Sequence, residues 1–442
     1  MKIQLSDHFD YIRLLRFTIP SMLMMIFTSV YGVVDGLCVS NFVGKEALAA
    51  VNLVWPFSMF CSSIGMMLGT GGAALIARTL GRGQQERAKG LFSMVVAVAI
   101  IASIVLTVIG IIFMPEIATI LGADETLEPL AITYGRILTL SLVFFVMQNM
   151  FQTLLITAER PQFGFLFIVA AGVINIVLDI LFLMVLHWGI EGAAWATLIS
   201  CMVGGFGPLL YFLLPNKSPL HFVRPLWDMK ALRKICGNGS SEMVLDLSIP
   251  LCTMLYNLQL MKFLGQDGVA AFGVVNYVNM VFISLFIGYL MGIESIVAYH
   301  YGAQNSDEVQ NLRRRSIHLM LGIGLVMFLG GELLAYPLSK VFVGYDTNLL
   351  ALSVHAFRLY AIGFLIMGMN ALASSFFTAL GNGWVSAIIS FCRTFLFQAL
   401  SVLVLPLILG LDGIWLALAV GEFICLFVSY YYYLKYKTRY NY

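Results

Sequence analysis

Long stretches of apolar residues make up most of the chain, and short segments rich in charge, glycine or proline separate them. Residues 91–114, for example, run for 24 positions without a charged side chain. Because a bilayer core about 30 Å thick needs roughly 20 helical residues, such a stretch predicts a transmembrane helix. Twelve are expected, near residues 15–39, 50–77, 91–114, 131–157, 163–186, 190–214, 236–263, 269–299, 316–341, 349–379, 384–409 and 413–434. A membrane barrel would instead alternate apolar and polar residues in segments of about ten, a pattern this sequence lacks.

The composition supports the same fold class, an all-α membrane protein. Of 442 residues, 60% are hydrophobic and only 11% are charged, whereas a soluble domain carries about 25% charged residues. So few charges would not cover the surface of a soluble enzyme. A net charge of +2 gives no basic field for nucleic acid. The seven cysteines have no metal-binding spacing and are expected to be small core residues.

The distribution of Lys and Arg predicts the orientation in the membrane. An even number of spans places both termini on one side, and 19 of the 25 Lys and Arg residues fall on that side. Three fall on the opposite side and three lie within spans. Because cytoplasmic loops carry an excess of Lys and Arg, both termini are expected in the cytoplasm of a multi-pass protein of the cell membrane.

The sequence repeats itself at an offset of 221 residues, half its length. Between residues 40–81 and 261–302, ten of 42 positions are identical, and several of them are glycines near predicted turns. Six spans per repeat is an even number, so the two repeats must be parallel rather than inverted. We therefore expect two six-helix halves, residues 1–221 and 222–442, with a substrate cleft between them.

Three polar residues in the first half lie deep in predicted spans. Asp35 is in the first span, and Asn175 and Asp179 are four residues apart in the fifth, which places them on one helix face. Because charged groups inside a membrane are costly, they usually serve a function. This face could hold a cation such as Na⁺ on its oxygens, or a proton on a carboxylate. The alternative is a polar network that only fastens two helices together.

The second half carries a different set of ionisable groups within its spans, namely Glu242, Asp246, Glu294, Arg393 and Glu422. At the offset of 221, Asp35, Asn175 and Asp179 align instead with Tyr256, Leu396 and Leu400. One half could therefore carry the ion chemistry while the other serves substrate binding or gating. Arg393 is expected as a counter-ion of Glu242 or Glu294, and Glu422 as a residue that holds helices together. Glu242 could equally lie at the cytoplasmic mouth, because the seventh span starts nearby.

Two further features allow a functional and a structural interpretation. Pro20 lies 15 residues before Asp35, where it either permits a bend in the first span or occupies the first turn of that span. The 23 methionines and 33 phenylalanines would suit flexible walls around varied apolar substrates, or they fill the core and face lipid.

In several motifs the chain resembles the multidrug and toxic compound extrusion (MATE) transporters. The resemblance rests on the segment 35–50 (DGLCVSNFVGKEALAA), on the turn 77–83 and its counterpart 298–304, and on Asn175 with Asp179. It implies export of organic cations or other amphiphiles by alternating access, driven by H⁺ or Na⁺ as the coupling ion. No other cofactor and no enzymatic activity are implied, and a monomer is expected.

The DinF-like branch of that family implies roles for particular residues. Its coupling site in the first half matches Tyr31, Asp35, Asn175, Asp179 and Thr197, and Pro20 matches the position where the first helix bends. Asn149, which aligns with Asn370 in the repeat, matches a polar cavity position. Glu242 resembles an acidic residue of the NorM-like branch, although the surrounding residues 239–243 depart from that pattern. The expected cavity residues are thus Asn149, Glu242, Asp246, Glu294, Asn370 and Arg393.

Three other classes of membrane protein fit the sequence less well. A lipid or lipid-linked oligosaccharide flippase of the same superfamily would need a cationic cavity for pyrophosphate, and only Arg393 is placed near the middle of a span. A major-facilitator transporter would have a long central loop, which is missing here. An intramembrane enzyme would need paired catalytic groups on facing helices, and the one Asp-x-x-Asp, Asp7 to Asp10, precedes the first span.

Overall fold

The computed structural model describes residues 3–125, 127–216, 218–344 and 346–440, apart from the side chains of residues 37, 40, 41, 45 and 48. The described part therefore excludes three of the Lys residues counted for the membrane orientation, namely Lys2, Lys217 and the side chain of Lys45. The first half contains α1 (Tyr11–Phe42), α2 (Lys45–Gly81), α3 (Gln85–Ile112), α4 (Met114–Ile120), α5 (Glu128–Thr157), α6 (Pro161–Asp179), the π-helical turn η1 (Ile180–Val185) and α7 (Gly189–Leu213).

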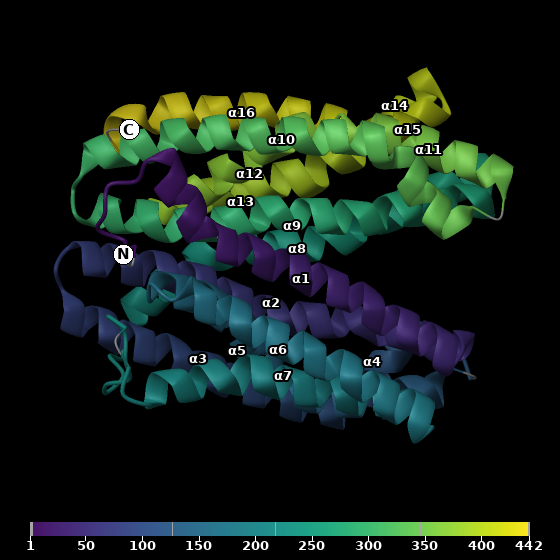
Figure 1. Cartoon of the computed structure of the whole chain (residues 1–442), viewed down its shortest axis with the longest axis horizontal. Coiled ribbons are helices and arrows are strands. Elements are labelled where there is room, and N and C mark those ends of the chain that lie inside the picture. Colours follow the sequence, from purple (N-terminus) through teal and green to yellow (C-terminus); the bar gives the residue numbers. More distant parts are fainter. Residues whose placement is uncertain (1–2, 126, 217, 345, 441–442) are drawn as a thin grey trace.

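The second half contains a matching series of helices. These are α8 (Met229–Leu264), α9 (Gln266–Gly302), α10 (Ser306–Val343), α11 (Thr347–Ala361), α12 (Phe364–Ala379), α13 (Gly383–Phe391), the π-helical turn η2 (Cys392–Leu396), α14 (Phe397–Leu409), α15 (Leu411–Trp415) and α16 (Ala417–Tyr440). Two groups of helices lie side by side, and α1 crosses between them (Figure 1).

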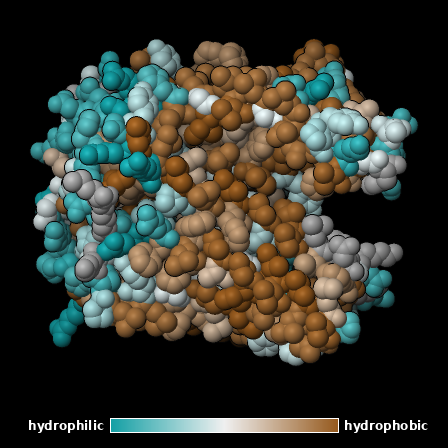
Figure 2. Space-filling view, in the orientation of Figure 1, coloured by the Kyte–Doolittle hydropathy of each residue, from teal (hydrophilic) through white to brown (hydrophobic). Residues whose placement is uncertain are grey.

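The length and hydropathy of these helices agree with a multi-pass membrane protein. Eleven helices in the described part are long and apolar enough to cross a bilayer. Helices α11 and α12 bend by 45° at their junction and make a twelfth span if they are counted together. An apolar band covers the middle of the face seen in Figure 2, and hydrophilic residues gather at the end that carries both termini.

Glycines at matching positions of the sequence repeat lie at the starts of helices. Gly44 and Gly265 precede α2 and α9 with φ of 115° and 64°, and Gly189 and Gly410 occupy equivalent turns with φ of 59° and 60°. Only glycine adopts such positive φ values without steric cost. The glycine matches in the sequence repeat therefore mark turns that both halves share.

Helices α2 and α9 cross at backbone distance near the end that carries the termini. Gly81 lies against the backbone of Tyr299, and Gly302 lies against the backbone of Arg78. Because Arg78 and Tyr299 are themselves 221 residues apart, each half makes the same contact with the other. A reciprocal contact of this kind is expected between two halves related by a two-fold axis.

The segment before α1 folds back over the same end and contacts both halves. The Leu5 N–H donates to Glu159 at 3.0 Å in the α5–α6 turn. His8 Nδ1 lies 2.5 Å from the Glu308 carboxylate at the start of α10, and the Phe9 N–H donates to the same carboxylate at 2.9 Å. Leu5 and Phe9 are fully buried, so this segment anchors the start of α1.

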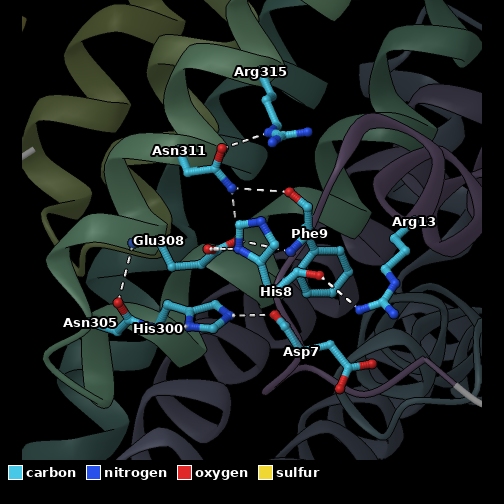
Figure 3. Close-up of polar contacts among 9 residues, drawn as sticks. All are labelled: Asp7, His8, Phe9, Arg13, His300, Asn305, Glu308, Asn311 and Arg315. Atoms are coloured by element: carbon cyan, nitrogen blue, oxygen red, sulfur yellow. Dashed lines mark hydrogen bonds and ion pairs between the residues drawn. The ribbon is translucent and has the colours of Figure 1, made fainter.

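Further polar contacts complete this anchor (Figure 3). The Asn311 side chain donates to the Phe9 carbonyl and to Glu308, both at 3.0 Å. The Arg315 guanidinium donates to Asn311 at 2.6 Å, and the His300 ring lies 3.2 Å from the Asp7 carbonyl. Nothing in the composition or hydropathy pattern indicated this network, because it depends on which helix the segment meets.

Replacing Gly81 or Gly302 by alanine would insert a methyl group where two backbones already touch. We expect each variant to lose about 1–3 kcal/mol of unfolding free energy, the usual cost of overpacking. Gly322 is the matched control, since nothing lies within 4 Å of the position its Cβ would take and alanine favours a helix. Thermal unfolding of the purified variants in detergent measures the difference. Equal midpoints for Gly81→Ala and Gly322→Ala would contradict this packing.

Candidate functional site

A cavity of about 890 Å³ lies between the two halves, with walls from α1, α2, α8, α9 and the helices that follow. Along α2 it extends from Asn52 to Thr70, and it ends where Gly71 brings α2 against the backbone of α8. The molecular surface is hollowed between the two groups of helices at the end opposite the termini (Figure 2). The cavity is therefore closed toward one end of the protein.

Methionine and aromatic side chains form much of the cavity wall. The methionines that line it are Met25, Met59, Met66, Met254, Met261, Met280, Met291 and Met367. Flexible, polarisable side chains of this kind adapt to ligands of different shape. These eight methionines line the cavity, and Met291 and Met367 among them also belong to the buried apolar core, so both interpretations of the methionine content apply.

Ionisable groups from four elements face the same cavity. Glu242 and Asp246 come from α8, Glu294 from α9, Glu422 from α16 and Arg393 from η2. Four carboxyl groups thus share the cavity wall with one guanidinium, so the wall is acidic. The four predicted cavity residues among them, Glu242, Asp246, Glu294 and Arg393, are brought together as the sequence suggested.

Arg393 pairs with Glu422, whereas the sequence favoured Glu242 or Glu294 as its partner. Arg393 Nη1 lies 3.5 Å from Glu422 Oε1, with side-chain exposures of 11% and 3%. The prediction missed Glu422 as the ion-pair partner, because Glu422 lies on α16 and the helix rotation that turns it toward η2 is not readable from hydropathy. Arg393 also interacts electrostatically with Glu242, one of the two partners expected. Glu422 nevertheless joins helices, as expected of it.

Asn370 and Asn149 do not line this cavity, contrary to prediction. Asn370 is fully buried, and its amide donates to both the carbonyl and the carboxylate of Glu422 at 2.7 Å. The Ser429 hydroxyl donates in turn to Asn370 at 2.8 Å. Asn370 therefore binds Glu422 without itself lining the cavity. Asn149 is half-buried on α5 and accepts a 3.4 Å contact from Gln152.

Two buried acceptors in the cavity wall are left without a protein partner. Glu294 and Asn279 are 5% and 7% exposed, and one oxygen of each has no hydrogen-bond partner among the described residues. Buried polar atoms are nearly always satisfied, so these two oxygens suit a bound molecule that donates hydrogen bonds or carries positive charge. Asn279 was not among the cavity residues expected from the sequence, although an amide within an apolar span was a signal that could have indicated it.

The first half contains a second acidic cluster, outside the lining of this cavity. Asp35 on α1 interacts with Asn175 and Asp179 on α6. Asn175 and Asp179 are buried. Neither Asp179 oxygen has a hydrogen-bond donor at a suitable distance and angle within the described part of the chain. The π-helical turn η1 begins directly after Asp179, and such turns occur often at functional sites. The three predicted residues are thus brought together.

Tyr31 is held beside this cluster by packing on α6. Its ring lies against Gly172, where a Cβ would stand 3.0 Å from the ring edge, and its hydroxyl interacts with Gln148. The Thr197 hydroxyl donates to the Ala193 carbonyl within α7 at 3.0 Å. Among the described residues, no hydrogen bond joins Thr197 to the cluster, so its place in a cation site stays a prediction.

Helix α1 continues through Pro20 from Tyr11 to Phe42. The proline is therefore well inside the helix, and the alternative that it occupies the first turn is wrong.

The described residues include no group of three or more His, Cys, Asp or Glu side chains that could hold a metal ion. Side-chain oxygens gather at two places, around Asp35 and in the large cavity, and α1 borders both.

Comparisons with known proteins give a consistent result. A family model described as MatE matches residues 20–181 and 243–403. The chain is 27% identical over 345 residues to "Probable multidrug resistance protein YoeA" of Bacillus subtilis, covering 74% of this chain and 72% of that relative. It is 23% identical over 428 residues to "Multidrug export protein MepA" of Staphylococcus saprophyticus, covering 93% and 91%.

A solved structure described as the outward-facing conformation of a multidrug resistance MATE family transporter of the MOP superfamily has the same fold. The TM-score is 0.93 at 23% identity, covering 98% of this chain and 97% of that one. The expected fold, an all-helical membrane protein, is thereby confirmed.

Glu422→Gln would leave the Arg393 guanidinium buried without its counter-ion. Breaking a buried pair from one side typically costs about 3–5 kcal/mol. We expect the double variant Arg393→Gln, Glu422→Gln to recover part of this loss, because no unpaired charge remains. Unfolding of the purified variants in detergent, analysed as a double-mutant cycle, measures both effects. The control is Glu332→Gln, whose exposed pair with Arg358 at 3.6 Å should contribute little; an equal loss there would contradict the assignment.

Proposed function

Because the chain belongs to the MatE family, we propose that it is a secondary active multidrug exporter of the cell membrane. It exchanges organic cations or other amphiphilic compounds for H⁺ or Na⁺ by alternating access. The observation that carries this proposal is the large cavity between the halves, in which four carboxyl groups accompany one guanidinium. The names of the relatives, a multidrug resistance protein and a multidrug export protein, support the same substrate class.

The charge of the cavity wall selects among substrates. With all groups ionised, four carboxylates and one guanidinium leave an excess of negative charge, which attracts cations and repels anions. The methionine wall contributes non-directional apolar contacts. An oligosaccharide-lipid flippase would need the opposite sign of charge for its pyrophosphate, so we favour the exporter over that alternative.

We further propose the division into two parallel halves, 1–221 and 222–442, with both termini in the cytoplasm and one chain as the working unit. In this orientation the backbone contact of α2 with α9 and the segment before α1 close the cytoplasmic end. The cavity then faces outward, the state from which a drug is released. The inward-facing state must open these contacts, because alternating access exposes a site to one side at a time.

The ion-coupling site in this proposal is the Asp35 cluster, as in the DinF-like branch that the first-half residues resemble. Asp35 and Asp179 alternate between an ion-bound or protonated form and a charged form. Asn175, Tyr31 and Thr197 orient these carboxyl groups or supply further oxygen ligands. A ligand shifts a conformational equilibrium only through its different affinity for the two states, so ion loading must favour one arrangement of α1 and α6.

Asp35→Asn and Asp179→Asn should abolish gradient-driven export, because an amide neither loses a proton at working pH nor supplies a charged ligand to Na⁺. The measurement is dye efflux from proteoliposomes under separately imposed pH and Na⁺ gradients, which also identifies the coupling ion. Asp267→Asn, an exposed position in the first turn of α9, is the control and should transport normally. Wild-type transport by Asp179→Asn would refute the coupling assignment.

Glu294→Gln should weaken cationic substrates selectively. Hydrogen bonds to charged groups contribute about 1.5–3 kcal/mol, so the KM of a cationic dye is expected to rise about tenfold or more. The KM of a neutral amphiphilic dye should change little, since its contacts are apolar. Transport of the two dyes by the same proteoliposomes separates the effects. An equal rise for both dyes would contradict an electrostatic role of the cavity wall.

A further inference from the structure

A second cavity, of about 540 Å³, lies at the end that carries the termini and is separate from both acidic sites. Arg78 from the last turn of α2 and Lys234 from the start of α8 line it, together with the turn 381–384 between α12 and α13. No residue that lines it is acidic. Its walls therefore come from both halves of the chain and carry positive charge.

The Arg78 guanidinium is held in place without a carboxylate partner. It stacks over the Tyr301 ring at 4.8 Å and lies against Gly381, where a Cβ would stand only 2.6 Å from Nη1. Gly381 has φ of 75°, so the turn itself calls for glycine. Within the described part of the chain, no Asp or Glu forms an ion pair with Arg78 or Lys234. Both cations remain available to an anionic ligand.

The start of α13 adds backbone donors to the same cavity. The Asn382 side chain accepts from the Val385 N–H at 3.5 Å, and the Ser386 N–H bonds to the Asn382 carbonyl at 3.2 Å. The N–H groups of Gly383 and Trp384 in the first turn have no acceptor within the helix. Such groups, together with the helix dipole, favour a bound anion.

Asn238 provides an acceptor beside these donors. It is 7% exposed, and its amide nitrogen donates to the Thr378 carbonyl at 2.8 Å, which fixes the orientation of the amide. Its oxygen has no partner among the described residues. The cavity thus combines donors for an anion with one acceptor for a hydroxyl group, a combination that fits a phosphate ester carrying a free hydroxyl.

Three of these polar groups are not part of the scaffold that the two halves share, whereas Lys234 aligns with another basic residue, Arg13. At the offset of 221, Arg78, Asn238 and Asn382 align with Tyr299, Phe17 and Pro161. The fold therefore does not require polar residues at these positions. Capping of α13 accounts for Asn382, but no contact among the described residues uses the Asn238 oxygen, which a ligand of this cavity would engage.

We propose that this cavity binds the phosphodiester head group of an anionic phospholipid, and that a phosphoglycerol head group fits it best. Trp384 stands at the cavity with 76% of its surface exposed, and tryptophan anchors proteins at the membrane–water interface. Basic pockets between membrane-spanning helices at the cytoplasmic side are known to suit lipid head groups. A free phosphate ion shares the anionic chemistry but would make no use of the exposed indole.

The bound lipid has a consequence for the transport cycle. It contacts α2 of one half and α8 and α13 of the other, so it is held fully only while this end is closed. By its higher affinity for that state, the lipid shifts the equilibrium toward the closed end. This consequence rests on the proposed function, and the cytoplasmic placement of the cavity rests on the proposed orientation, whereas binding to the purified protein depends on neither.

The test is binding of lipid to the purified full-length protein in detergent, counted by native mass spectrometry. Phosphatidylglycerol, phosphatidylcholine and inorganic phosphate are the three probes. We expect phosphatidylglycerol to bind in preference to phosphatidylcholine. Lys234→Gln should weaken this binding about fivefold, which corresponds to the roughly 1 kcal/mol of one basic residue near a lipid surface. Arg78→Gln should weaken it further, because Arg78 is half-buried and held against Tyr301 and Gly381.

Arg233→Gln is the matched control, an exposed neighbour of Lys234 that does not line the cavity, and its binding should equal that of wild type. Since Lys234 is exposed, its variant is expected to fold even if Arg78→Gln does not. Equal affinity of wild type and Lys234→Gln for phosphatidylglycerol would overturn the site. Displacement of the lipid by millimolar phosphate, with the same dependence on Lys234, would overturn the lipid and assign a free anion. Neither result requires transport, so failure here is distinct from failure of the exporter proposal.

Discussion

The backbone contact between α2 and α9 decides where this molecule is closed and where it is hollow. Both helices have 37 residues, about 55 Å at 1.5 Å per residue, and their backbones touch where glycine removes the side chain. Gly81 and Gly302 make that contact at one end, and Gly71 and Gly292 bring the same helices against α8 and α1 further along. Beyond Gly71, bulky residues such as Met66 face the cavity instead. A hollow at one end follows from close packing at the other.

Polar groups are distributed in a way that this geometry explains. Charge inside a bilayer is tolerated where it faces a cavity or another polar group rather than lipid. Glu242, Asp246 and Glu294 meet that condition because the diverging helices leave room for water or substrate beside them. Arg393 and Glu422 meet it by pairing with each other. Asp35 and Asp179 meet it by facing each other between α1 and α6, outside the large cavity.

The sequence predicts the parts of the structure that depend on local chemistry. The span expected at 190–214 is the helix Gly189–Leu213, because hydropathy and turn residues alone set its limits. Asn175 and Asp179 could be placed on one face because their spacing follows from helix geometry. Contacts between distant helices could not be derived in this way. The position of Asn370 behind Glu422 depends on the rotation of α12 and α16, and the 45° bend in the span expected at 349–379 depends on packing around its break.

Helix α1 is the element through which the two acidic sites can affect each other. On one face its Ser29 hydroxyl lies 2.5 Å from that of Ser284 on α9, and Met25 and Ser29 line the large cavity. On another face Tyr31 packs on Gly172 of α6, beside Asp35. Close-packed helices move as units rather than deform continuously. In the proposed mechanism, a change in the pairing of Asp35 with α6 would therefore displace the cavity wall that α1 contributes, and the ion and the drug would need no other connection between their sites.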